Sequence, residues 1–278
     1  MLTRHTLWRI VITSRPLQAL AIGLLATGVA ALLWLAAPAT NAALEWSVYD
    51  RWLSHRPPIA LSSSLTIIAP DPERVDQEGL VSLDRAQLAQ LITTAHDSGA
   101  IAIGLAHRLS HASPSQLGGA ASDVLFSEAL ATAGPVVTVA SDDMPETPGS
   151  VALGHLHLQL HSDHIARLIP LSVTQGTRTV PAFGSRLYTL ATHQPLAVAP
   201  DDTRLINPVG DGSFAAFPTL SWSAVWDALQ RQDATALDRW FNGKVVVILP
   251  SRPSDEPWLL PTGARVSSTT AHLHLLNS

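Results

Sequence analysis

Three closely spaced histidines are the residues of this chain whose types and spacing most resemble a metal site. Apolar and polar residues alternate over part of the segment 151–169, which predicts a half-exposed β-strand. His155, His157 and His161 fall on its polar face, where residues two apart lie about 7 Å from each other. Imidazoles at that spacing bind Zn²⁺ or Cu²⁺, with Asp163 as a further ligand. The alternatives are a solvated polar face and a pH-responsive role, because histidine titrates near neutral pH.

Charged residues near predicted strand ends and in neighbouring loops form a second candidate site. Asp71 follows an apolar run, and Arg85 and Asp123 lie near the ends of other predicted elements. Ligands of wound α/β sheets bind outside the carboxyl ends of the strands, so these three side chains are candidate ligand contacts. The alternative is structural, since an aspartate also caps helices and an Asp–Arg pair fixes loops.

Motifs that would indicate catalysis do not occur in the sequence. It contains no Gly-x-Ser-x-Gly, no phosphate loop and no His-Glu-x-x-His, and its 278 residues include no cysteine. A hydrolase assembled from dispersed Ser, His and Asp residues is the remaining alternative. We therefore predict a non-enzymatic protein without a cofactor. The net charge of −5 also argues against a nucleic-acid partner.

A hydrophobic segment precedes all of these residues. Residues 17–37 carry no charge and span about 30 Å as a helix, the thickness of the bilayer hydrocarbon. Three arginines and no acidic residue precede the segment, so the positive-inside rule places residues 1–16 in the cytoplasm. We expect a single-pass inner (cell) membrane protein with residues 43–278 in the periplasm or outside the cell. The alternatives are a cleaved signal peptide, which usually has a shorter apolar stretch, and a buried core helix.

The exported part is predicted to be an α/β domain. Short apolar runs alternate with amphipathic helices, which indicates βαβ units and parallel strand pairs. The fold class expected is a wound, largely parallel sheet flanked by helices, with an antiparallel extension, preceded by one transmembrane helix. Strands are predicted at 64–69, 100–105, 135–140, 151–161, 165–173, 204–207 and 244–249, and helices at 43–55, 83–98, 123–133, 182–192, 222–229, 237–240 and 268–276.

The order of these elements and several short patterns resemble the type-2 CHASE family of extracellular sensor domains, over about residues 44–276. The patterns are Glu45–Trp52, Thr66–Asp71, Asp84-Arg85, Asp163 with Arg167–Leu171, Arg204–Gly210 and Trp240–Val247. The resemblance implies a non-catalytic sensory or ligand-binding domain of a bacterial signalling system. It adds Asp163 and Arg167 to the expected ligand-binding residues.

Family members usually continue into a cytoplasmic output domain, whereas this chain ends at Ser278. We therefore expect a degenerate or truncated copy of the sensor that works through a separate signalling partner or as a homodimer. Its ligand would be a small molecule or a protein, of a kind that the sequence does not specify. The alternative function is a periplasmic metal-binding protein that uses the histidine-rich strand.

Overall fold

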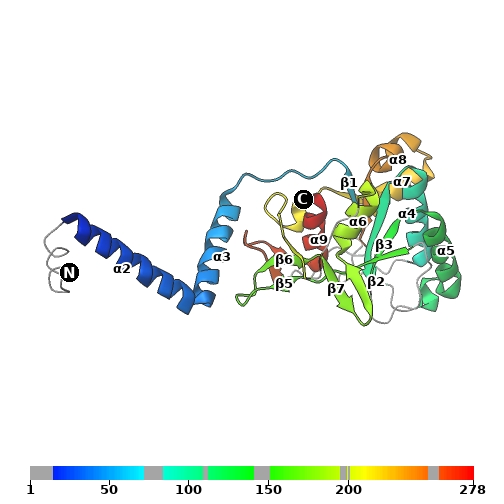
Figure 1. Ribbon diagram of the computed structural model, residues 1–278. Helices are drawn as coiled ribbons and strands as arrows, with labels where there is room; N and C mark the ends of the chain where they lie inside the picture. Colours follow the sequence, from blue (N-terminus) through cyan, green and yellow to red (C-terminus); the bar gives the residue numbers. More distant parts are fainter. Residues whose placement is uncertain are drawn as a thin grey trace. The chain divides into compact units, whose positions relative to one another are not determined.

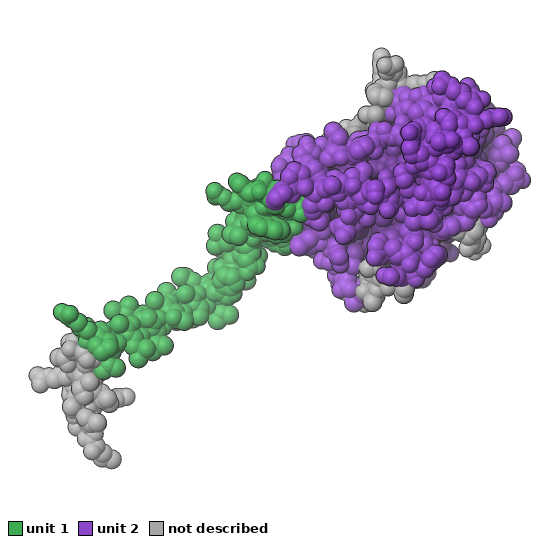
Figure 2. Space-filling view, turned by 90° about the horizontal axis from the view of Figure 1, so that it is seen from above, with its two compact units in different colours: residues 1–56 green, residues 57–278 purple. Residues whose placement is uncertain are grey.

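The computed structural model describes residues 15–71, 84–108, 112–140, 151–194, 199, 201–249 and 257–278. The chain divides into two compact units, residues 1–56 and residues 57–278, which are coloured separately in Figure 2. The predicted class is confirmed, because a parallel sheet flanked by helices carries antiparallel extensions and follows one apolar helix (Figure 1).

The first unit consists of two helices, α2 (Arg15–Ala36) and α3 (Pro38–His55). No residue of α2 is buried, and its length and composition suit a membrane span, so it is not the buried core helix considered above. Helix α3 begins five residues before its predicted start, because proline is tolerated in the first turn of a helix. It ends as predicted before Arg56, which has an extended backbone.

The second unit is built on a six-stranded sheet in which every pair of neighbours is parallel. Its order is β10-β1-β11-β2-β3-β4, and the strands are β1 (Leu65–Ala69), β2 (Ala102–Arg108), β3 (Val136–Val139), β4 (Val151–Gly154), β10 (Thr219–Ser221) and β11 (Val245–Ile248). The central strands are almost continuous apolar runs because both faces of the sheet are buried. Ile67 and Ile68, for example, belong to cores on opposite faces of β1.

Helices cover both faces of this sheet (Figure 1). One face packs against α4 (Arg85–Asp97), α5 (Gly119–Thr132), α7 (Trp222–Gln230) and α8 (Ala234–Phe241). The other packs against α6 (Phe183–Thr192) and α9 (Ser268–Asn277). Helix α4 lies within the predicted range 83–98, with Asp84 capping its start and Gly99 at a positive φ of 85° beyond its end.

Close approach of α6 to the sheet depends on a glycine in β4. A Cβ on Gly154 would lie 2.6 Å from the Cα of Phe183, the first residue of α6. Because the obstructing atom is backbone, it could not move aside as a flexible side chain would. Glycine at this edge strand therefore determines how closely α6 packs on the sheet.

The antiparallel extension consists of several short pieces. Strands β5 (Gln159–Leu160), β6 (Ala166–Pro170) and β9 (Thr203–Leu205) form a three-stranded sheet, and β7 (Ser172–Gln175) and β8 (Arg178–Pro181) form a hairpin. A third pair joins β12 (Trp258–Leu259) to β13 (Arg265–Val266), and two 3₁₀ turns occur at η2 (Ser115–Leu117) and η3 (Phe214–Ala216). Helix α9 connects the parts, since it contributes Leu273 to the core under the parallel sheet and Leu275 to the core under β6.

The single strand predicted for residues 151–161 is wrong. The chain leaves the parallel sheet after Gly154 and re-enters a strand only at Gln159, in the antiparallel sheet. Apolar and polar residues alternate across this break because Leu156 and Leu158 are half-buried whereas His157 is exposed. Local periodicity thus resembles one strand, although the backbone makes two.

Candidate functional site

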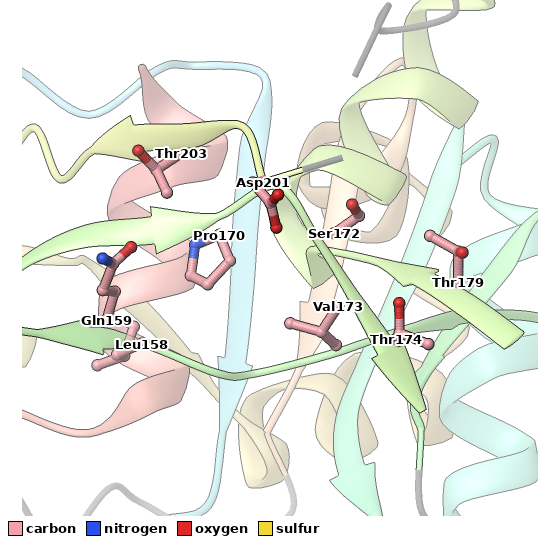
Figure 3. A pocket seen from close by; sticks show the side chains of 9 residues that line it. All are labelled: Leu158, Gln159, Pro170, Ser172, Val173, Thr174, Thr179, Asp201 and Thr203. Carbon is pink, nitrogen blue, oxygen red and sulfur yellow. The ribbon is translucent and has the colours of Figure 1, made fainter. Parts of the chain in front are cut away.

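A cavity of about 960 Å³ opens between the three-stranded sheet and the β7–β8 hairpin (Figure 3). Three of its nine described lining residues are apolar, Leu158, Pro170 and Val173. The other six are polar: Gln159, Ser172, Thr174, Thr179, Asp201 and Thr203. Its volume lies at the upper end of the range of sites for small molecules.

The polar groups of this cavity are not used to hold the protein together. None of the six polar side chains forms a hydrogen bond or ion pair with another residue of the described ranges. Asp201 carries the only formal charge among the described lining residues, and its backbone has a positive φ of 70°, which aspartate tolerates better than most residues. Four hydroxyl groups, one amide and one carboxylate are therefore available to a bound molecule.

None of the predicted site residues lines this cavity. Asp71 lies at the carboxyl end of β1, where its two oxygens accept hydrogen bonds from the side chain and backbone N–H of Ser223, at 2.5 and 3.1 Å. Ser223 is in the first turn of α7, so this carboxylate joins the end of a strand to the start of a helix. The structural role considered for Asp71 is the one that these contacts favour.

Arg85 and Asp123 form an ion pair between α4 and α5, with 2.5 Å from Nη1 to Oδ1. Asp123 also accepts hydrogen bonds from the backbone N–H of Ser113, at 3.2 and 3.1 Å. Both charged side chains are only one-fifth to one-quarter exposed. Their arrangement fixes the loop before α5 against α4.

Asp163, in the turn between β5 and β6, forms a second ion pair with Arg167 of β6. Two guanidinium nitrogens of Arg167 donate to the two carboxylate oxygens, at 3.0 and 2.6 Å. Hydrogen bonding to Arg167 is the main cause that lowers the pKa of Asp163 from 3.8 to about 2. Arg167 is only 2% exposed, so its charge is buried. The five predicted ligand contacts thus occupy three separate places in the fold.

The three predicted metal-binding histidines do not share one strand face. His155 is buried after β4, His157 is exposed in the connection, and His161 lies beyond β5. Within the described ranges, no group of three or more His, Asp or Glu residues is arranged to hold a metal ion. The strand geometry on which the metal hypothesis rests is therefore absent, and metal titration remains its test.

A different partner, His272 of α9, lies against His155. Their rings are 5.7 Å apart and perpendicular, and the ring of His157 is 5.5 Å from that of His155. His155 Nδ1 accepts from the backbone N–H of His157 at 3.1 Å, which leaves the proton of the neutral ring on Nε2. His272 Nε2 lies 3.3 Å from the His157 carbonyl oxygen and must be the donor, so its Nδ1 is unprotonated.

The two remaining nitrogens of this pair, His155 Nε2 and His272 Nδ1, are buried and form no hydrogen bond within the described part of the chain. Burial lowers the pKa of His155 to about 4, assisted by the nearby charge of His157 and opposed by the Pro170 carbonyl. Burial likewise lowers the pKa of His272 to about 3, assisted by the charges of His155 and His157. Both rings are therefore neutral at physiological pH.

The cavity residues were missed by sequence reasoning because hydroxyl residues in short strands give no local signal. His272 was missed because its neighbours in space, His155 and His157, lie more than a hundred positions away. The alternation of His272 with His274 in the sequence was visible, yet the two residues have different environments. His274 uses both ring nitrogens, accepting from Val209 N–H and donating to the Gly212 carbonyl.

Comparison with known proteins identifies a family. The sequence model of the CHASE2 domain family matches residues 24–278, which includes part of α2 and all of the second unit. No curated protein and no solved structure matches the chain significantly.

Proposed function

The chain belongs to the CHASE2 domain family of extracellular sensory domains, and on this premise we propose that it is a membrane-anchored, extracytoplasmic ligand-binding domain of a bacterial signalling system. CHASE2 domains are generally non-catalytic, and we propose the same for this chain. The observation that carries the proposal is the cavity, which is lined by six polar residues whose side chains have no partners among the described residues. Such a space suits reversible binding of a small molecule.

The position of the candidate site supports a role in sensing. The cavity lies between two small antiparallel elements that are not paired strand to strand, since the β7–β8 hairpin forms a separate two-stranded sheet. A ligand that contacts both elements binds one relative arrangement better than others and so shifts their equilibrium. The two elements are joined by a single residue between β6 and β7, and its neighbours Pro170 and Ser172 both line the cavity.

We propose that α2 stays in the inner membrane as an uncleaved anchor, with the second unit on the periplasmic side. The family match supports retention of the anchor because it begins at residue 24, inside α2. Signals would pass through this helix or through a separate partner protein. Helix α3 exposes Leu44, Val48 and Trp52 at four-residue spacing, which supports pairing of two copies next to the membrane.

Ligand binding can be tested without knowing the ligand. The full chain in lipid nanodiscs is heated with and without a dialysable small-molecule extract of the host's growth medium and periplasm. A ligand at one hundred times its Kd stabilises the folded state by about 2.7 kcal/mol. For a domain of this size we expect the Tm to rise by about 5–10 °C. An extract that leaves the Tm unchanged at every concentration would contradict the proposal.

The membrane topology can be tested with single cysteines, because the chain contains none. Ser127→Cys places a thiol on the exposed side of α5, and Thr3→Cys places one before α2. A membrane-impermeant maleimide applied to intact spheroplasts should label the first variant and not the second. Labelling of the second variant, or loss of residues 1–37 from the purified protein by mass spectrometry, would refute the proposed anchoring.

A further inference from the structure

The charge and hydrogen-bonding groups of the cavity restrict the chemistry of what it binds. Four hydroxyl groups, on Ser172, Thr174, Thr179 and Thr203, each donate one hydrogen bond and accept up to two. The amide of Gln159 donates and accepts, whereas the carboxylate of Asp201 only accepts. Acceptors therefore outnumber donors, and a complementary ligand has to supply many O–H or N–H groups.

The same residues disfavour a negatively charged ligand. Among the described lining residues there is no lysine, arginine or histidine, and the one charged side chain is a carboxylate. An anion about 4 Å from this carboxylate would bind at least about fivefold more weakly than a neutral molecule of the same shape. A cation at the same distance would bind more tightly than the neutral molecule by a similar factor.

We propose that the cavity binds a small molecule that is rich in hydroxyl groups and is either uncharged or positively charged, such as a polyol, a sugar or an amino sugar. This inference rests on the proposed function, because it names the class of ligand for the same site. No aromatic residue lines the described part of the cavity, so binding comes from hydrogen bonds more than from ring stacking. The apolar surface of Leu158, Pro170 and Val173 would contact the C–H faces of such a molecule.

The test divides the same small-molecule extract by charge. Ion exchange separates it into neutral, cationic and anionic fractions, and each fraction is assayed for its effect on the Tm of the full chain in nanodiscs. We expect activity in the neutral or cationic fraction, and we expect periodate, which cleaves vicinal diols, to abolish it. Activity confined to the anionic fraction, or resistance to periodate, would overturn the proposed class.

Two substitutions examine whether this activity belongs to the cavity. Thr203→Trp and Thr174→Trp each fill the space from an exposed strand position, and two independent positions guard against misfolding of one variant. Thr93→Trp, on the exposed face of α4, is the matched control. In each cavity variant, the extract concentration that gives half of the maximal Tm shift should rise at least tenfold. In the control variant this concentration should not change. Binding that survives in both cavity variants would place the ligand elsewhere.

A third substitution separates the two permitted charges. Asp201→Asn should weaken a cationic ligand about fivefold and leave a neutral ligand within twofold, with Asp97→Asn as the control of equal charge change. Either result is compatible with the class, whereas tighter binding to Asp201→Asn would indicate an anion and overturn it. If only the anionic fraction raises the Tm, the proposed ligand class is wrong but the proposed sensory function is not contradicted. An extract without any effect contradicts both proposals.

Discussion

Replacing the buried histidine pair by residues that do not titrate is the perturbation whose effect on stability can be worked out most fully from the structure. His155 and His272 are each about 1% exposed, and each uses one ring nitrogen in a hydrogen bond with the backbone of His157. The substitutions His155→Asn and His272→Gln keep an acceptor in place of Nδ1 and a donor in place of Nε2, respectively. They remove the proton-binding site without removing the hydrogen bond that the structure uses.

The expected magnitude follows from the pKa values. Folding lowers the pKa of His155 from 6.5 to about 4 and that of His272 to about 3, so the unfolded chain binds protons at a higher pH than the folded chain does. Neither ring affects stability above about pH 7.5, where both states are neutral, and stability is lost as the pH falls through 6.5 toward 4. At pH 5 each ring lowers the free energy of unfolding by about 2 kcal/mol, and the pair together lowers it by about 4 kcal/mol.

The titratable groups that act on these two rings are each other and His157, and neither ring has an ion pair within the described residues. The carboxyl group of Asp163 also has a lowered pKa, but it titrates below pH 4 in both the folded and the unfolded chain and does not contribute between pH 8 and pH 5. A loss of stability between pH 8 and pH 5 can therefore be assigned to the pair by comparing the native chain with the double variant.

Urea unfolding of the full chain in detergent micelles, followed by tryptophan fluorescence at pH 8 and pH 5, measures this difference. Between these two pH values the native chain should lose about 4 kcal/mol more unfolding free energy than the double variant does. His96→Asn, at an exposed position on α4, should behave like the native chain. Equal losses in the native chain and the double variant would refute the reasoning.

Three further predictions follow from other contacts. Asp163→Asn should destabilise the domain by about 3 kcal/mol because it removes the bidentate partner of the buried Arg167 charge, and addition of Arg167→Met should recover part of this loss in urea unfolding. Gly154→Val should cost at least about 2 kcal/mol because its Cβ would meet the backbone of Phe183, and an unchanged Tm would contradict the packing described. Zinc titration by calorimetry should give no binding tighter than micromolar, because His155 is buried and its Nδ1 is occupied; tight binding lost on His155→Ala would restore the metal hypothesis.

Much of the fold could be predicted because it is encoded locally. The apolar runs that form β1, β3 and β11 are buried on both faces, and their continuous hydrophobicity distinguishes them from the amphipathic helices around them. Asp84 and Gly99 mark the ends of α4 by local backbone chemistry. Strand β10 was missed because three residues carry too little periodicity to be recognised.

The candidate site could not be predicted in the same way. Its described residues come from five short strands, β5 to β9, and from the segments just before β5 and β9, and none of them is distinctive in its own segment. The charged residues that stood out in the sequence, such as Asp71 and Arg85, prove to be bonded within the protein. Charged side chains form strong hydrogen bonds and ion pairs, and in the folded protein these interactions join secondary-structure elements.

The sequence by itself determined the apolar N-terminal helix, the α/β class and the family, since hydrophobic length, periodicity and ordered motifs are properties of the chain. The tertiary structure decided which histidines meet, because His155 and His272 come together only when α9 packs beneath the parallel sheet. It also decided that the strand predicted across residues 151–161 is divided between two sheets. Contacts between distant segments depend on the sum of all packing energies, which no local pattern records.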